Sequence, residues 1–362
     1  MQLRRKGWLF SLFRIFCHVL TLIYSIIANL RLLLYGLRLI PARQLPAYVI
    51  SIGNITVGGT GKTPFVLFLA EKIAKKGDKV GIISRGYGSS GKPAGSPANR
   101  GKNDIKSKFS INDDEEFPLP ANVIRYLGAD RYSAGMKLCE VDGVKTIILD
   151  DGFQHLKLKR DLNIVLIDAT NPFGSGFLLP AGSLREPLWA LRRADIFVIT
   201  HADLTDDKRM EFLEARLNSY RKKIVKTIHK PQHLVAINRQ AGAVVDLSEV
   251  KNRSVWEFCG IGNPYQFHKT LGLFCNVKGM SVFLDHHYYT KTDMNYVFLQ
   301  AKKNNVKAII TTEKDALRLK DFELQNEIPV YYLKIEIEVV QGDEIIKNIV
   351  SPKSLEDTQH VS

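Results

Sequence analysis

The sequence predicts an α/β fold, in which a mostly parallel sheet carries helices on both faces and a second, smaller α/β domain follows. Three observations lead to this prediction. Short β-branched runs alternate with helical stretches, the same alternation restarts after about residue 226, and the 362 residues suffice for two to three domains. Hydrophobic residues make up 45% and charged residues 24%, which excludes a wholly disordered, collagenous or polytopic membrane protein.

The first element is an apolar, basic segment over residues 1–43. Residues 7–30 are apolar except for Arg14 and His18, and the first 43 residues supply half of the net charge of +14 without one acidic residue. This combination indicates a membrane-anchoring helix that is attracted to an anionic membrane surface. Arg14 in the middle favours a helix lying in the interface over one that spans the bilayer, and a buried helix of a soluble fold stays an alternative. Nucleic acid is not expected as a partner, because zinc-ligand, RNP and basic-zipper patterns are absent from the sequence.

The next elements are five strands, each short and rich in β-branched residues. They are expected at Ala47–Ile52, Val80–Ser84, Thr146–Leu149, Asn163–Asp168 and Ile196–Thr200. A helix over Pro64–Lys76 separates the first two, as βαβ units of a parallel sheet require. Ligands in such folds bind at the carboxyl ends of the strands.

The chain divides into a nucleotide-binding α/β domain over residues 44–225 and a smaller C-terminal α/β domain over 226–350. Residues 87–120 are rich in Gly, Ser, Pro, Asn and Lys, which predicts a flexible loop or lid. The cysteines, Cys17, Cys139, Cys259 and Cys275, are scattered without a CxxC spacing, as expected of reduced thiols in the cytosol.

The turn after the first strand has the sequence of a phosphate-binding loop. The order of strand, glycine-rich loop and helix is the one that P-loop NTPases use, and glycines let backbone N–H groups approach phosphate oxygens. The predicted nucleotide contacts are Thr56, Val57, Gly58, Gly59, Thr60, Gly61, Lys62 and Thr63. Lys62 is expected to reach the β and γ phosphates of ATP, and Thr63 to bind Mg²⁺. The general motif has glycine where this chain has Thr56.

Polar residues after two later strands complete the predicted site. Asp150 and Asp151 end a buried strand and are expected to hold Mg²⁺, and Gln154 follows them. Arg185 and Glu186 stand in a loop rich in Pro and Gly, where the arginine would neutralise a transferring phosphoryl group and the glutamate would bind the metal. Residues 200–203, with the sequence THAD, have a weak likeness to the base-reading NKxD loop of GTPases and are left out of the predicted site.

Several motifs in fixed order resemble the tetraacyldisaccharide 4′-kinase family of lipid A synthesis. They are GNITVGGTGKTP, SRGYG, LDDGFQH, LLPAGSLREPL, RRAD, CGIGNP, DHHYYT and TTEKDA, over roughly residues 47–318. The family loop carries Ser or Thr at the position of Thr56. The resemblance implies a magnesium-dependent lipid kinase that transfers the γ-phosphate of ATP to the 4′-hydroxyl of an acylated glucosamine disaccharide 1-phosphate. It also implies a location at the cytoplasmic face of the Gram-negative inner membrane, and we expect a monomer.

The resemblance further implies a catalytic pair of one aspartate and one histidine. His286 is preferred over His287 for the histidine, and Asp113 over Asp114 for the aspartate. The family has a GDEP-like segment where this chain reads INDDEEFP, so the choice between the two aspartates stays open. Arg185 is the third predicted catalytic residue, and Arg131 is a candidate to bind the sugar 1-phosphate.

Two other functions remain as alternatives. A membrane-associated P-loop switch NTPase acting on a protein partner would use the same loop, but the DHH and LREP segments would have no role in it. A non-catalytic lipid-binding protein with a relic loop is disfavoured, because Lys62, Thr63 and the acidic pair are all present.

Overall fold

The computed structural model describes residues 2–84, 119–237, 241–285, 287–319, 322 and 328–351. Asp113, Asp114, His286 and nearly all of the predicted loop over 87–120 lie outside the described residues. The described residues fall into two compact units. One holds those within Met1–Arg85, Ala121–Lys226 and Val340–Ser362, and the other holds those within Gly86–Pro120 and Thr227–Val339.

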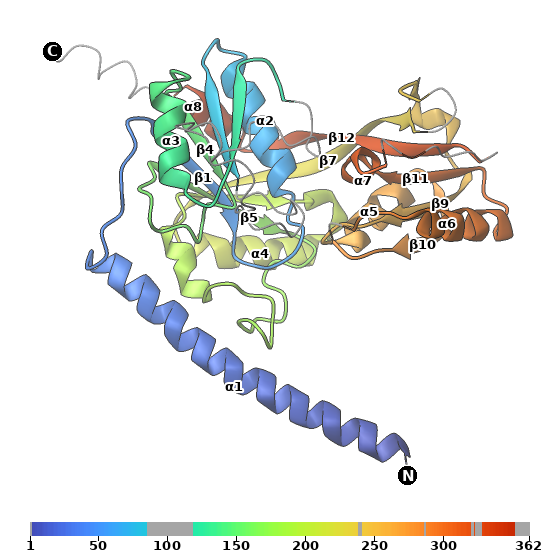
Figure 1. The fold of residues 1–362 in the computed structure, drawn as a ribbon, viewed down its shortest axis with the longest axis horizontal. Coiled ribbons are helices and arrows are strands. Elements are labelled where there is room, and N and C mark those ends of the chain that lie inside the picture. The colour runs from blue at the N-terminus through green and yellow to red at the C-terminus, as the bar shows by residue number, and fades with distance from the viewer. Residues whose placement is uncertain are drawn as a thin grey trace, which may run out of the picture. The chain divides into compact units, whose positions relative to one another are not determined.

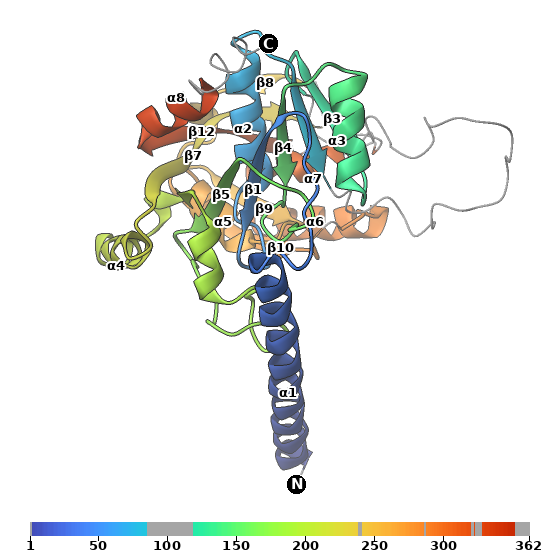
Figure 2. The same cartoon turned by 90° about the vertical axis from the view of Figure 1, so that its left-hand side faces the viewer.

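The chain begins with one long helix, α1 (Gln2–Gly36). Its part over Phe13–Gly36 is long and apolar enough to cross a membrane by length and composition. Figures 1 and 2 show α1 leading away from the sheet of the first unit. Its second half is attached to that unit, because Leu32 packs with Leu156 and Ala190, and Thr21 Oγ1 accepts a hydrogen bond of 2.9 Å from Ala181 N.

The first unit is a parallel sheet with helices between its strands (Figure 1). Its elements are β1 (Tyr48–Asn54), α2 (Lys62–Ala74), β2 (Val80–Ser84), β3 (Val123–Leu127), α3 (Arg131–Glu140), β4 (Thr146–Asp150), β5 (Leu162–Asp168), η2 (Leu188–Arg193), β6 (Ile196–Thr200), η3 (Ala202–Leu204) and α4 (Asp207–Asn218). The strand order is β3-β2-β4-β1-β5-β6, and every pair is parallel. The fold class predicted from the sequence is confirmed.

The strands of this sheet are buried along almost their whole length. Six of the seven residues of β1 and all five of β2 are buried, as strands covered on both faces require. The central position of β1 puts the end of this strand between the ends of β4 and β5, at the same edge of the sheet. Residues that follow β1, β4 and β5 therefore meet at one place.

The second unit has the same kind of construction. Its elements are β7 (Lys223–Ala236), which begins beside β6, then β8 (Val244–Val245), η4 (Leu247–Glu249), β9 (Ser254–Cys259), α5 (Pro264–Gly272), β10 (Asn276–Val282), α6 (Lys291–Lys303), β11 (Ala308–Thr312), α7 (Glu313–Leu317) and β12 (Val330–Gln341). The order is β10-β9-β11-β12-β7, and β8 pairs antiparallel with β7. The last helix, α8 (Asp343–Val350), belongs to the first unit.

Candidate active site

The loop between β1 and α2 has the backbone that a phosphate site needs. Gly58 and Gly61 have φ values of 114° and 76°, in the left-handed region that favours glycine. Gly61 is the N-cap of α2, so the first N–H groups of the helix lie at the loop. Such N–H groups and the helix dipole favour a bound anion. Lys62 is the first residue of this helix and Thr63 the second.

The neighbouring segment 183–185 holds the loop in place through two backbone hydrogen bonds. Val57 N donates a hydrogen bond of 2.8 Å to Ser183 O, and Arg185 N donates one of 2.8 Å to Ile55 O. Inside the loop, Asn54 Nδ2 donates to Thr56 O at 2.8 Å. The LREP segment over 184–187 is therefore joined by its backbone to the phosphate loop.

The acidic turn after β4 packs closely on β1. A Cβ atom on Gly53 would lie 2.6 Å from Phe153 N, so only glycine permits this approach. Gly152 N donates to Ile52 O at 2.9 Å, and Gln154 Nε2 donates to Asn54 O at 2.8 Å. These contacts bring the segment 150–155 to the phosphate loop. Gln154, predicted as a nucleotide contact, here uses its amide group to hold the end of β1.

Asp151 is the centre of the ion pairs in this site. Arg185 donates from Nη1 to Asp151 Oδ1 at 2.8 Å and to Oδ2 at 2.7 Å, and Lys62 Nζ lies 3.7 Å from Oδ1. Lys62 Nζ also donates to Asn54 Oδ1 at 3.2 Å. Burial works to raise the pKa of Asp151, but Lys62 and Arg185 more than offset it and the pKa is lowered. Asp151 is therefore ionised at neutral pH and aligns two cations beside the loop.

Asp150 has a different environment from its neighbour. Its Oδ2 accepts a hydrogen bond of 3.3 Å from Ser84 Oγ at the end of β2. Burial raises the pKa of Asp150 and the charge of Lys62 opposes this. A partly desolvated carboxylate at the strand edge, with the Thr63 hydroxyl on the adjoining helix, offers the hard oxygen ligands that Mg²⁺ takes. The donor set therefore fits the metal.

Glu186 lies beside a different cation. Its carboxylate forms an ion pair with Arg193 of η2, and Glu186 is only 3% exposed. Burial raises the pKa of Glu186, while Arg193, Arg31 and Arg160 lower it. Arg193 engages Oε2 of this carboxylate, whereas Oε1 is buried and accepts no hydrogen bond from the described residues, so the predicted role of Glu186 as a metal ligand stays a prediction.

The sequence analysis missed the position of Arg131. This side chain is 5% exposed, and it donates to the backbone oxygens of Asp151 at 3.2 Å and Asp150 at 3.1 Å. Arg131 therefore holds the backbone of the acidic turn. The sequence analysis named Arg131 only as a candidate to bind the sugar 1-phosphate, which stays a prediction. Its neighbour Asp130 caps α3, because the Asp130 side chain accepts from Ser133 N.

The remaining predicted catalytic residues are outside the described residues or in the second unit. Asp113 and His286 are not described. His287, the less favoured histidine, stacks on Phe283 with ring centroids 4.9 Å apart, and its Nε2 lies 3.0 Å from Asp293 Oδ2. No cluster of three or more His, Cys, Asp or Glu side chains that could hold a metal ion occurs among the described residues.

Comparison with known proteins identifies close relatives. The model of the tetraacyldisaccharide-1-P 4′-kinase family matches residues 13–352. A tetraacyldisaccharide 4′-kinase of Halothermothrix orenii is 37% identical over 342 residues, which cover 88% of this chain and 87% of the relative. The enzyme of the same name from Syntrophus aciditrophicus is 36% identical over 347 residues, covering 91% and 90%.

A solved structure agrees with the sequence comparisons. The crystal structure of LpxK from Aquifex aeolicus in complex with ATP matches with a TM-score of 0.63 and 28% identity. The match covers 93% of this chain and 98% of that one.

Proposed function

The chain belongs to the tetraacyldisaccharide-1-P 4′-kinase family and is an ATP-dependent kinase of lipid A biosynthesis, and from this premise we propose how its residues carry out the transfer. The proposal rests chiefly on one observation, the contact of Lys62 and Arg185 with the carboxylate of Asp151 beside the phosphate loop. The switch NTPase is not favoured by these relatives.

The phosphate loop would bind the triphosphate of ATP through the N–H groups of residues 56–63. Phosphoryl transfer depends on positioning and charge neutralisation more than on covalent chemistry. Lys62 and Arg185 are aligned by Asp151 and would offset the charge on the γ-phosphate. Thr63 and Asp150 would hold Mg²⁺, which supplies further charge neutralisation when it is bound.

The attacking group would be the 4′-hydroxyl of the acylated disaccharide 1-phosphate. We retain Asp113 and His286 as the pair that orients this hydroxyl and takes its proton, on the strength of the family resemblance alone. General-base help is worth about 10² to 10⁴ in rate. Replacement of Asp113 by Ala should then lower turnover far more than it weakens ATP binding, and unchanged turnover would move the role to Asp114.

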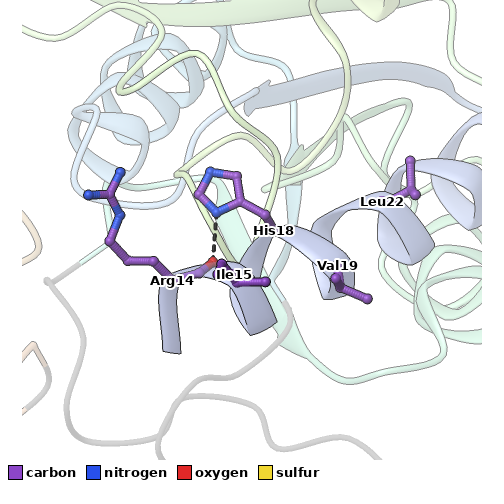
Figure 3. A pocket seen from close by; sticks show the side chains of 5 residues that line it. All are labelled: Arg14, Ile15, His18, Val19 and Leu22. Atoms are coloured by element: carbon purple, nitrogen blue, oxygen red, sulfur yellow. Dashed lines mark hydrogen bonds between the residues drawn. The ribbon is translucent and has the colours of Figure 1, made fainter. Parts of the chain in front are cut away.

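The protein would act at the cytoplasmic face of the inner membrane, where α1 meets the lipid. Exposed apolar side chains cover most of the helix, among them Phe13, Phe16 and Ile23. A hollow of about 500 Å³ on α1 is lined by Arg14, Ile15, His18, Val19 and Leu22. Figure 3 shows how these five side chains lie on the helix. His18 Nδ1 donates to Arg14 O at 2.7 Å, and the His18 ring contacts Phe177 at 5.7 Å between centroids.

The test is transfer of labelled γ-phosphate from Mg·ATP to a tetraacyl disaccharide 1-phosphate in detergent micelles. We expect labelled lipid with the natural protein, loss of the label with Lys62→Ala, and no change with Lys76→Ala, which removes an exposed lysine just after α2. Labelled inorganic phosphate without labelled lipid would contradict the proposal and support the switch NTPase.

A further inference from the structure

Three motifs of the sequence lie at one edge of the sheet in the second unit. CGIGNP begins at the last residue of β9, DHHYYT follows β10, and TTEKDA runs from the end of β11 into α7. These strands lie in the order β10-β9-β11 and pair in parallel, so their carboxyl ends share one edge. Ligands of parallel sheets bind at such edges.

Asp315 of α7 is the buried centre of this edge, with an exposed fraction of 0%. Its Oδ2 accepts hydrogen bonds from Gly260 N at 3.1 Å and from Thr312 Oγ1 at 2.6 Å. Its Oδ1 accepts one of 3.2 Å from Arg318 Nη1, which also donates to Gly260 O at 3.3 Å. Burial of a carboxylate is costly unless such bonds satisfy it. Here the bonds join the turn after β9 to α7.

Tyr289 brings the DHHYYT segment to the same carboxylate. Tyr289 is buried, and burial together with the charge of Asp315 raises the pKa of its hydroxyl. A Cβ atom on Gly260 would lie 3.2 Å from Tyr289 Oη and 3.3 Å from Asp315 Oδ1, so both oxygens lie against this glycine. The Tyr289 ring also packs edge-on against Phe258 of β9, with the centroids 5.5 Å apart. The end of the DHHYYT segment is therefore fixed to β9 and α7.

The start of the same segment contacts the residue before Asp315. Lys314 Nζ donates a hydrogen bond of 3.3 Å to Asp285 Oδ1. His286 lies outside the described residues, but Asp285 precedes it and Tyr289 follows it in the sequence. Two successive residues of α7 therefore lie against DHHYYT on the two sides of position 286.

We propose that Asp315 is a positioning residue for the transfer, because with Lys314 it holds the chain on both sides of the histidine that takes the proton of the 4′-hydroxyl. The inference rests on the proposed function, since it needs His286 in that role. A base must lie within hydrogen-bond reach of the proton that it takes, and a misplacement of about 1 Å costs on the order of 10² in rate. Asp315 and Lys314 are assigned no contact with ATP, so the affinity for ATP should not depend on them.

The test is a double-mutant cycle on kcat, measured for the full chain with saturating Mg·ATP and a tetraacyl disaccharide 1-phosphate in detergent micelles. Asp315→Asn keeps the shape of the side chain but replaces one acceptor oxygen by an amino group. It should lower kcat about tenfold and leave the affinity for ATP unchanged. In a His286→Ala background the same change should have no further effect, because no base is left to position. An equal loss in both backgrounds would show a merely structural role and overturn the inference.

Lys314→Ala is a second test that leaves the buried hydrogen bonds of Asp315 in place. It should lower kcat about threefold, and Lys314→Arg, which keeps a cation for Asp285, should restore natural kcat. The matched control is Lys303→Ala, at the exposed end of α6, which should keep natural kinetics. Natural kcat in Lys314→Ala would overturn the inference, even where Asp315→Asn fails to fold. Natural kcat in His286→Ala alone would instead remove the proposed role of that histidine, and the inference with it.

Discussion

Tyr24 Oη of α1 donates a hydrogen bond of 2.7 Å to the backbone oxygen of Arg185. The side chain of Arg185 contacts both carboxylate oxygens of Asp151, and its N–H contacts Ile55 O before the phosphate loop. Helix α1 is therefore bonded to the residue that joins the phosphate loop to the acidic turn. Thr21 contacts the same loop region through Ala181, so the attachment has more than one bond.

We predict that Tyr24→Phe lowers turnover about three- to tenfold and leaves the affinity for ATP unchanged. Loss of one hydrogen bond of roughly 1 kcal/mol would loosen Arg185 without removing its charge. Initial rates at saturating ATP, together with ATP binding, measure the two effects. Tyr35→Phe removes a hydroxyl from the same helix away from Arg185 and is the control. Equal rates in the two variants would contradict a positioning role for Tyr24.

Replacement of Arg185 by Lys should lower kcat by about 10- to 100-fold, although the charge is kept. Arg185 Nη1 alone contacts both oxygens of Asp151, which leaves the other guanidinium nitrogens for a phosphate, whereas lysine has a single nitrogen for both partners. Steady-state kinetics with the lipid acceptor check this. Arg192→Lys, at an exposed position of η2, is the matched control and should keep natural kinetics. Natural activity in Arg185→Lys would show that only the charge matters.

The sequence predicted the sheet, the phosphate loop and the acidic turn because each is local. The loop is specified within residues 48–74 by a buried strand, three glycines and a helix. Because β4 pairs in parallel with β1, the end of β4 brings Asp150 and Asp151 to this loop. Contacts between distant segments were not predictable in this way. Tyr24 and Arg185 lie 161 residues apart in the sequence, and Arg131 lies 20 residues from Asp151. Neither hydrogen bond has a local sequence pattern, because the partners meet only through packing.

Glu186 has a partner that the sequence did not indicate. The LREP motif suggested a metal ligand, which stays a prediction, and the structure pairs one oxygen of Glu186 with Arg193. We predict that Glu186→Gln lowers the free energy of unfolding by about 2 kcal/mol, because the half-buried Arg193 then lacks its counter-ion. The dependence of activity on Mg²⁺ concentration should be unchanged.

Thermal unfolding and a magnesium titration of activity separate the two roles of Glu186. Glu211→Gln, at an exposed position of α4, is the control for both measurements. A raised requirement for Mg²⁺ in Glu186→Gln, without a loss of stability, would favour the metal-ligand role.

His155 should make stability depend on pH in the acidic range. Burial, with the positive charges of Arg131, Arg160, Lys157 and Arg31, lowers the pKa of His155 from 6.5 to about 4. The unfolded chain therefore binds a proton between these values that the folded chain does not, and stability falls as pH drops from about 6.5 to about 4. Because His155 is partly exposed, we expect a loss on the order of 1 kcal/mol after allowance for solvent screening.

Denaturant unfolding at pH 7 and at pH 5 measures this loss, and His155→Gln should reduce it by removing the titrating group while keeping a polar side chain. His233→Gln, a replacement in β7 of the second unit, is the control and should leave the pH dependence as it is. A loss of equal size in the natural protein and in His155→Gln would assign the acid sensitivity to carboxyl groups whose pKa is lowered in the folded state, among them Asp151 and Asp130.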